Sequence, residues 1–215
     1  MRVCLRREFP STVSRILDIG AGTGLLSLMI AQKNLTAKID AVEIDESAAI
    51  QSESNFAASP WKERLKIFRA DIRDFNQLNN QPFNQYDLII TNPPFYENDF
   101  KTENKKRNIA LHSDALNFEE LLIVFENNLT ANGKFAVLLP YHRSIYFKRL
   151  VEQKKFYLNK KILVKQTFKH NYFRSILLFS RTFALTNQSE IIIQNEHNKY
   201  TPEFVELLKD YYLHF

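Results

Sequence analysis

The clustering of its few glycines is the strongest constraint on how this chain can fold. The 215 residues include four glycines, and three of them, Gly20, Gly22 and Gly24, alternate within one short stretch. An apolar run, Arg15–Ile19, precedes them, and a second one, Leu25–Ala31, follows. Glycine is favoured where φ is positive or where another group approaches the backbone closely. A strand, a glycine turn and a helix N-terminus in this order would surround a small polar ligand with backbone N–H groups.

Strand-like and helix-like segments alternate through the first three quarters of the chain. The expected strands are 15–19, 37–43, 65–70, 86–91 and 134–139, and the expected helices are 25–33, 46–58, 118–129 and 144–154. We expect Asn132-Gly133 to end the third of these helices before the last strand begins. The alternation predicts an α/β fold in which helices cover both faces of a parallel sheet.

The pattern changes after residue 156. Two β-rich runs, 157–168 and 174–183, are joined by a short polar link, which predicts an antiparallel hairpin. A short strand at 191–194 and a helix from Thr201-Pro202 to about Leu213 complete the chain. The sequence therefore predicts one domain over 1–215, with a mostly parallel, seven-stranded sheet and a hairpin and helix within 157–215.

Composition and charge narrow the classes of protein. No apolar run approaches the ~20 residues that a membrane span needs, and residues 1–14 are basic but lack the apolar core of a signal peptide. The single cysteine, Cys4, cannot form an internal disulfide and fits a cytoplasmic protein. The net charge of +5 is consistent with an anionic partner.

Acidic residues end the second and third expected strands. Glu43 lies about 20 residues after Gly24, where an acid binds the ribose hydroxyls of an adenosine cofactor. Asp71, together with the N–H of Ile72, could pair with the edge of an adenine ring. The alternatives are a helix N-cap, which we assign to Asp45 instead, and a solvated loop aspartate at 71.

The fourth expected strand ends in Asn92-Pro93-Pro94-Phe95. The two prolines cannot donate to the sheet and fix an extended turn, which would hold the Asn92 side-chain oxygen and the Pro93 carbonyl at the end of the strand. Residues 95–115 follow as a polar, basic stretch. We expect a substrate loop there, because open α/β sheets bind ligands at the carboxyl ends of their strands.

These motifs resemble those of the class I S-adenosylmethionine methyltransferases that modify amino groups. They are Asp-Ile-Gly-Ala-Gly-Thr-Gly, Val-Glu-Ile-Asp, Ala-Asp and Asn-Pro-Pro-Phe. Lys106-Arg107-Asn108 and the ending from Tyr200 to Leu213 are similar to those of the bacterial tRNA(Val) (adenine-N6)-methyltransferase family. The resemblance implies a Rossmann-like fold and S-adenosylmethionine bound by Asp18, Gly20, Ala21, Gly22, Gly24, Glu43, Ile44, Asp71, Ile72 and Asn92. That family carries a longer N-terminal segment than residues 1–14, so we expect this chain to be truncated or its start to be misassigned.

The resemblance also implies the chemistry. The N6 of adenine is a poor nucleophile, and Asn92 and Pro93 would accept its two hydrogens as positive charge develops on the nitrogen. Pro94 completes the turn, and Phe95 would stack on the flipped base, unless it is a core aromatic that anchors the turn. We predict no metal, and we expect a monomer that acts on position 37 of valine tRNA. The expected RNA contacts are Phe95, Tyr96, Lys105, Lys106, Arg107, Lys169 and Arg174.

Several alternatives remain open from the residues alone. A nicotinamide dehydrogenase shares the glycine turn and the ribose acid, but it has no use for Asn-Pro-Pro-Phe. A methyltransferase acting on ribosomal RNA, DNA adenine or a protein glutamine would use the same tetrapeptide. A protein that kept the fold only to bind RNA is a third class, and each basic residue taken singly could belong to a solvated face.

Overall fold

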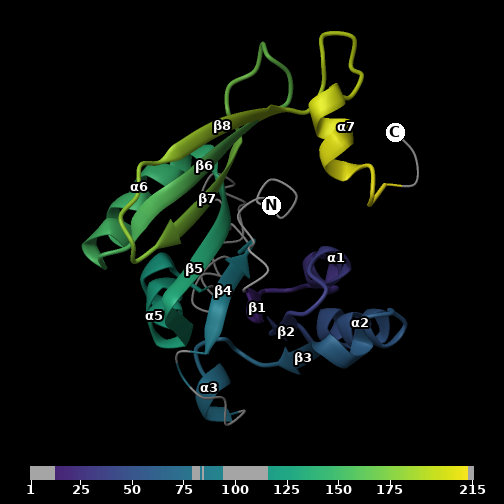
Figure 1. The fold of residues 1–215 in the computed structure, drawn as a ribbon, viewed down its shortest axis with the longest axis vertical. Helices are drawn as coiled ribbons and strands as arrows, with labels where there is room; N and C mark the ends of the chain where they lie inside the picture. The colour runs from purple at the N-terminus through teal and green to yellow at the C-terminus, as the bar shows by residue number, and fades with distance from the viewer. Residues whose placement is uncertain (1–12, 79–82, 84, 94–115, 213–215) are drawn as a thin grey trace, which may run out of the picture.

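A twisted, mixed β-sheet runs through the protein in this computed structural model, which describes residues 13–78, 83, 85–93 and 116–212 (Figure 1). Within these residues the sheet has eight strands in the order β3-β2-β1-β4-β5-β7-β6-β8. The strands are β1 Arg15–Ile19, β2 Lys38–Glu43, β3 Leu65–Arg69, β4 Tyr86–Thr91, β5 Leu129–Pro140, β6 Tyr157–Lys165, β7 Arg174–Ser180 and β8 Asn187–Ile192. Strands β1 to β5 are parallel, which confirms the predicted α/β class.

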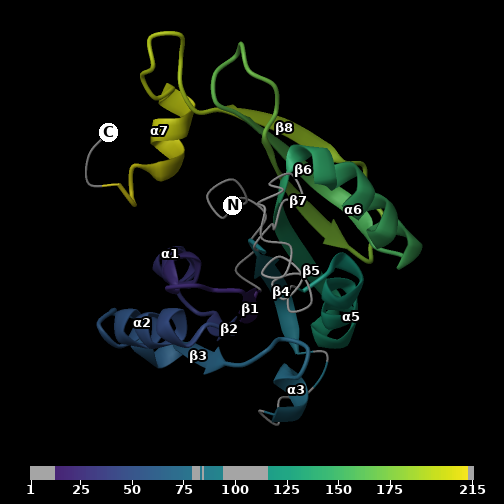
Figure 2. The same ribbon diagram turned by 180° about the vertical axis from the view of Figure 1, so that it is seen from behind.

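Helices cover both faces of this sheet (Figures 1 and 2). On one side lie α1, Leu25–Lys33, and α2, Glu46–Ala57; on the other lie α5, Phe118–Asn128, and α6, Tyr141–Gln153. Three shorter helices are η2 Lys62–Arg64, α3 Phe75–Leu78 and α7 Pro202–Leu208. None of the helices in the described ranges is long and apolar enough to cross a bilayer.

The core consists of two apolar clusters, one on each face. Successive residues of β1 divide between them, because side chains alternate along a strand: Ile16 joins the cluster beneath α1, and Leu17 joins the cluster beneath α5 and α6. In the second cluster the ring of Phe135 stacks on Phe125 and Phe179 at centroid distances of 4.2 and 5.1 Å. Burial on both faces explains why these strands are apolar runs without alternation.

The order of the strands places a ligand site between β1 and β4. The chain moves outward from β1 to β2 and β3, and then returns to β4 and β5 on the other side of β1. Loops that follow β1 and β4 therefore leave in opposite directions at the carboxyl edge of the sheet. Such a switch point is where open α/β sheets bind ligands.

The prediction for Asn132-Gly133 was wrong. Helix α5 ends at Asn128, and β5 begins directly at Leu129, so Gly133 lies inside a long strand. The pairing of β4 with β5 shifts there, from Tyr86–Leu129 to Leu88–Lys134. A Cβ on Gly133 would lie 2.9 Å from the carbonyl oxygen of Tyr86. The glycine is required by this close backbone approach and not by the end of a helix.

The C-terminal third also differs in detail from the prediction. The sheet has eight strands in the described residues instead of the predicted seven. The short strand expected at 191–194 is β8, which begins at residue 187 and pairs in parallel with β6. Strands β6 and β7 end earlier than expected, at Lys165 and Ser180, so that the connection between them spans 166–173. Helix α6 begins at Tyr141, three residues before the expected start and directly after Pro140, the last residue of β5.

Candidate active site

The carboxyl ends of four neighbouring strands bring the predicted motifs together. Ile19 pairs with Val42 on one side and with Thr91 on the other. The glycine turn after β1 therefore lies between Glu43, the last residue of β2, and Asn92, the first residue after β4. The hydroxyl of Thr91 donates to the carbonyl of Ile19 at 2.9 Å and ties the two strand ends together.

The three glycines have the conformation that their sequence predicted, but they have two different surroundings. Their φ angles are +68° at Gly20, +57° at Gly22 and +79° at Gly24, all in the left-handed region. A Cβ on Gly24 would lie 2.5 Å from both Phe56 and Ser52 of α2, whereas a Cβ on Gly20 or Gly22 would meet no atom of the described residues within 4 Å. Gly24 therefore packs the turn against α2, and the other two glycines face open space.

Glu43 lies against the glycine turn. One carboxylate oxygen accepts from the backbone N–H of Gly22 at 2.7 Å, and the other accepts from the N–H of Asp45 at 2.9 Å. Each oxygen keeps acceptor capacity for a further donor. Asp45 caps α2, as expected, and Ile44, which lies between Glu43 and Asp45 in the chain, has an exposed side chain.

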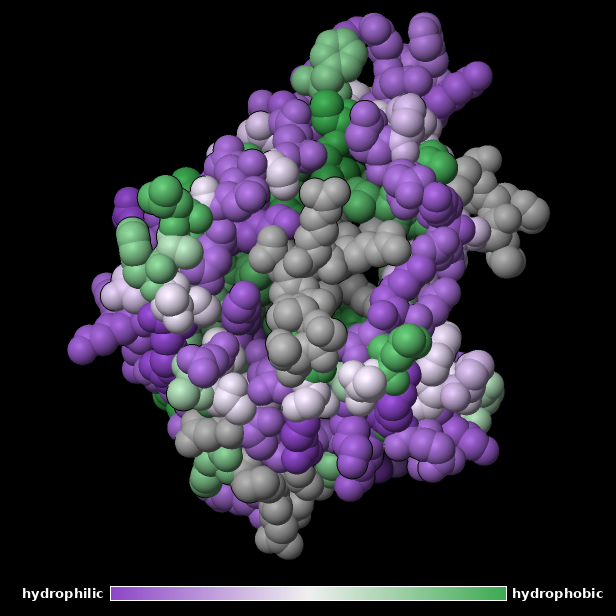
Figure 3. Space-filling model, in the orientation of Figure 1, coloured by the Kyte–Doolittle hydropathy of each residue, from purple (hydrophilic) through white to green (hydrophobic). Residues whose placement is uncertain are grey.

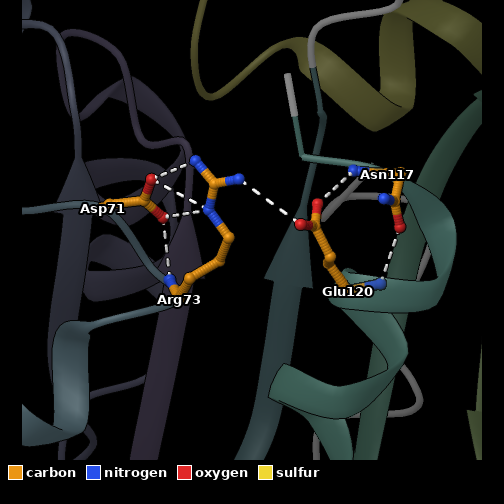
Figure 4. A network of polar contacts seen from close by, with 4 residues as sticks. All are labelled: Asp71, Arg73, Asn117 and Glu120. Atoms are coloured by element: carbon orange, nitrogen blue, oxygen red, sulfur yellow. Dashed lines mark hydrogen bonds and ion pairs between the residues drawn. The ribbon is translucent and has the colours of Figure 1, made fainter. Parts of the chain in front are cut away.

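Asp71 is held by an arginine that lies outside the predicted motifs. The backbone N–H and the guanidinium of Arg73 both donate to the Asp71 carboxylate, and the same guanidinium reaches Glu120 at 3.4 Å (Figure 4). Glu120 forms a capping box with Asn117 at the start of α5. The hydrogen bond from Arg73 lowers the pKa of Asp71. An acid followed two residues later by an arginine was the signal available in the sequence.

Asp18 lies behind the turn and is 2% exposed. Its carboxylate accepts a hydrogen bond from the Ser27 hydroxyl at 2.7 Å, which connects β1 to α1. Burial raises the pKa of Asp18 to about 7, the hydrogen bond from Ser27 opposes this rise, and the nearby Glu43 carboxylate adds to it. In the described residues, the Asp18 side chain thus contacts protein and is nearly closed to solvent.

The structure describes only part of the predicted catalytic turn. Asn92 is exposed and Pro93 is buried at the end of β4. The predicted residues Pro94, Phe95, Tyr96, Lys105, Lys106 and Arg107 lie outside the described residues. Ala21 and Ile72 are described: the N–H of Ala21 donates to the carbonyl of Val42 at 3.1 Å, and Ile72 is 7% exposed beside Asp71.

The two remaining predicted RNA contacts lie at the same edge of the sheet. Arg174 is the first residue of β7 and pairs with Pro140, the last residue of β5. Lys169 lies in the connection between β6 and β7, next to Phe168. Within the described part of the chain, no group of three or more histidine, cysteine, aspartate or glutamate side chains is arranged to hold a metal ion.

Known proteins resemble this chain in sequence and in fold. The family model called Methyltransferase small domain matches residues 3–158. A tRNA1(Val) (adenine(37)-N6)-methyltransferase from Flavobacterium johnsoniae is 42% identical over 199 residues, which cover 92% of this chain and 83% of that protein. Its counterpart from Yersinia pestis is 36% identical, covering 94% of this chain and 80% of the relative.

Solved structures show the same fold at low sequence identity. A protein described as a predicted O-methyltransferase from Agrobacterium tumefaciens matches with a TM-score of 0.75 and 14% identity over 97% of this chain and 96% of that one. TrmK from M. capricolum, solved with S-adenosyl-homocysteine, matches with a TM-score of 0.59 and 10% identity over 87% of this chain and 70% of that one. The chain belongs to the S-adenosylmethionine-dependent methyltransferases of the small-domain family, in the group of the tRNA1(Val) (adenine(37)-N6)-methyltransferases.

Proposed function

We propose that this protein transfers a methyl group from S-adenosylmethionine to the N6 amino group of adenosine 37 in tRNA1(Val). One observation carries the proposal. The Asn92-Pro93 turn follows β4 beside the glycine turn of β1, and Glu43 of β2 lies on the other side of that turn. This neighbourhood supports acceptors for an amine next to a site for an adenosine cofactor. The names of relatives at 36–42% identity support the choice of substrate.

The residues present fit the cofactor. The space before Gly20 and Gly22 leaves room for its methionine part, because no atom of the described part of the chain lies within 4 Å of a Cβ built there. The two oxygens of Glu43 each retain a lone pair for a ribose hydroxyl. Asp71 and Ile72 would bind the adenine edge, with the Asp71 carboxylate oriented by Arg73. Ile44 would contact the adenine ring with its exposed side chain.

The catalytic contribution of the chain is electrostatic and positional. When bound, S-adenosylmethionine supplies an electrophilic methyl group on a positively charged sulfur. The Asn92 side-chain oxygen and the Pro93 carbonyl would accept the two hydrogens of N6. As the nitrogen begins to bond to carbon, it gains positive charge, and these acceptors bind it more tightly than they bind the neutral amine. Phe95 would stack on the extruded base, and Lys169 and Arg174 would contact phosphates.

A labelling experiment tests the proposal. The protein would be incubated with radiolabelled S-adenosylmethionine and total tRNA from a strain that lacks this activity, and the nucleosides would then be separated. We expect N6-methyladenosine in valine tRNA alone. Label in ribosomal RNA, DNA or a protein glutamine would contradict the proposed substrate, and failure to bind the cofactor would contradict the enzyme itself.

The proposal extends to the state and location of the protein. We propose a cytoplasmic monomer, a location that the single cysteine Cys4 supports. Light scattering on the purified protein, with and without tRNA, measures the mass of the particle. A dimeric mass in both samples would contradict the monomer.

A further inference from the structure

The connection between β6 and β7, residues 166–173, lies at the same edge of the sheet as the candidate active site. We call these residues together with Arg174 the β6–β7 tip. Strand β5 is parallel to β4, and its last residue, Pro140, pairs with Arg174. The backbone N–H of Tyr141 donates to the carbonyl of Phe173 at 3.1 Å. In Figure 1 the tip projects at the top of the molecule, beyond the carboxyl end of β4.

The β6–β7 tip exposes two phenylalanines, each beside a cation. Phe168 is 50% exposed and Phe173 is 41% exposed. The Nζ of Lys169 lies 5.4 Å from the ring centroid of Phe168, and the guanidinium of Arg174 lies 5.9 Å from that of Phe173. Figure 3 shows hydrophobic residues among hydrophilic ones in this part of the surface. Exposed aromatic rings provide faces on which nucleic-acid bases can stack.

The β6–β7 tip is ordered by its own hydrogen bonds. The hydroxyl of Thr167, which is 8% exposed, lies 2.7 Å from Nδ1 of His170 and accepts from the N–H of Lys169 at 3.3 Å. The N–H of Phe173 donates to the carbonyl of Val164 at 3.1 Å. The two rings are therefore presented by a fixed turn, which lowers the entropy lost when a partner binds.

The charges around the tip favour a polyanion. Within the described residues, three cations near this edge make no ion pair: Arg143, Lys161 and Arg174. Lys165 pairs with Glu190 at 3.1 Å, and Lys169 lies 3.9 Å from Glu196. Cations therefore outnumber the acids that face them. Phosphates together with planar bases match both the charge and the exposed rings.

We infer that the β6–β7 tip binds the unpaired nucleotides that flank the target adenosine in the RNA substrate. Phe168 and Phe173 stack on bases, while Lys169 and Arg174 contact the phosphates between them. This inference rests on the proposed function, since it assumes an RNA with its target base at the carboxyl edge of the sheet. The tip then combines a stacking surface with an electrostatic one. Because only unpaired bases can stack on its rings, the tip selects single-stranded loops over duplex RNA.

A binding experiment tests the stacking. The anisotropy of a fluorescent anticodon stem-loop of tRNA1(Val) reports binding to the full chain, and a duplex of the same composition serves for comparison. We expect the double variant Phe168→Ala/Phe173→Ala to bind the stem-loop about 10-fold or more weakly. We expect its duplex binding, cofactor binding and melting temperature to stay unchanged, and Phe168→Tyr/Phe173→Tyr to retain stem-loop binding.

The opposite edge of the same strands provides a matched control. Tyr157 and Phe183 are 36% and 71% exposed, and their rings lie 5.5 Å apart. Tyr157 pairs with Ser180, at the other end of β6 and β7 from the tip. We expect Tyr157→Ala/Phe183→Ala to bind the stem-loop like the wild type. Equal losses in both double variants, or no loss in the tip variant, would overturn the inference.

The salt dependence of RNA binding tests the proposed phosphate contacts. Lys169→Gln/Arg174→Gln should reduce the slope of log affinity against log salt by about one for each phosphate that the variant no longer binds. Arg181→Gln, at the far edge and 4.4 Å from the ring of Phe156, should leave the slope unchanged. An unchanged slope in the tip variant would overturn the phosphate contacts.

The two hypotheses fail in different ways. A protein that binds the stem-loop through Phe168 and Phe173 but transfers no methyl group to adenosine would contradict the proposed function and leave this inference standing. If the protein methylates valine tRNA and its tip variants bind and methylate like the wild type, this inference fails and the proposed function stands. Stronger binding of a poly-glutamate peptide than of the stem-loop, abolished in the same variants, would replace RNA by an acidic protein partner.

Discussion

The two edges of the parallel sheet use polar residues in opposite ways. At the amino edge, Asp40 accepts hydrogen bonds from Arg15 and from the hydroxyl of Tyr86, both at 2.8 Å. Tyr86 is fully buried, and burial together with the Asp40 carboxylate raises its pKa, so that it stays a neutral donor. One oxygen of Asp87 accepts from two backbone N–H groups and the hydroxyl of Ser14. Protein groups thus satisfy these acids.

At the carboxyl edge the acids are only partly engaged. Each oxygen of Glu43 has one hydrogen bond from the backbone, and the side chain of Asp71 remains 21% exposed although Arg73 holds it. Two glycines leave the space beside them open. The acids of the amino edge have all their partners within the protein and so stabilise the fold. We propose that the acids of the carboxyl edge use their remaining capacity to bind a ligand. Substitutions at the amino edge should therefore reduce stability, and substitutions at the carboxyl edge should mainly reduce activity or cofactor binding.

The largest effect is expected from Asn92→Ala, at the carboxyl edge. It removes one of the two acceptors for the amine, so methyl transfer should fall by about 100-fold to 1000-fold, as when one preorganised group of a transition-state site is removed. Calorimetric binding of S-adenosyl-homocysteine should stay within a few-fold of the wild type. Unchanged turnover would show that this edge does not act on the amine as we propose.

A second prediction compares two glycines of the same turn. Gly24→Ala combines a left-handed backbone with contacts of 2.5 Å to Phe56 and Ser52, so it should destabilise the fold by about 3 kcal/mol. Gly20→Ala meets no atom and should cost only about 1 kcal/mol, the strain of its backbone, while weakening cofactor binding. Urea unfolding measures both variants. Equal losses of stability would contradict the distinction between a packed and an open position.

A third prediction concerns the buried carboxyl behind the turn. Because the pKa of Asp18 rises from 3.8 to about 7 in the folded protein, the folded state binds more protons than the unfolded state between these values. Its contribution to stability therefore falls as pH rises from about 4 to 7 and is constant above. Asp18→Asn removes this titration. The variant should gain about 3 kcal/mol relative to the wild type between pH 5 and pH 8.

Urea unfolding at several pH values measures the difference between Asp18→Asn and the wild type. Comparing the two proteins cancels the carboxyls whose pKa is lowered, such as Asp71 and Glu190. A difference that does not change with pH would mean that Asp18 is charged in the folded protein, as expected for an acid that faces a ligand. The result thus decides to which of the two classes of polar residue Asp18 belongs.

The smallest effect is expected from Tyr86→Phe, at the amino edge. The variant loses one hydrogen bond to Asp40, which keeps Arg15 as its partner, so unfolding should become easier by about 1 kcal/mol. The turnover number and the affinity for cofactor should not change. A loss of activity larger than the loss of stability would contradict the division between the edges.

The sequence predicted the carboxyl edge better than the chain's tail, for physical reasons. Glycine at a positive φ and an acid at a strand end are local requirements, so Gly20, Gly22 and Glu43 could be placed from their neighbours in the chain. The role of Gly133 depends on the carbonyl of Tyr86 on another strand, and no local pattern contains that contact. The ion pair between Arg73 and Glu120 likewise joins residues 47 positions apart.

Strand β8 shows the same limit. Its first four residues are polar and exposed, and only Ile191 and Ile192 are apolar and half-buried, so the continuous apolar run that marks the central strands is missing. Its hydrogen bonds to β6 hold it in the sheet, and these depend on where the edge of β6 lies. Phe168 falls at the end of an expected strand, because a phenylalanine in a β-rich run is typical of a half-buried strand. Only the structure showed that β6 ends earlier and that the connection leaves this ring exposed.

The guanidinium of Arg73 has a consequence for how the protein could be divided. It contacts Asp71, which follows β3, and Glu120, which lies in the first turn of α5. Cutting the polypeptide between these residues would separate the two carboxylates that share one positive charge. Two fragments cut there would each lose a partner, since Arg73 would lack Glu120 and Glu120 would lack Arg73.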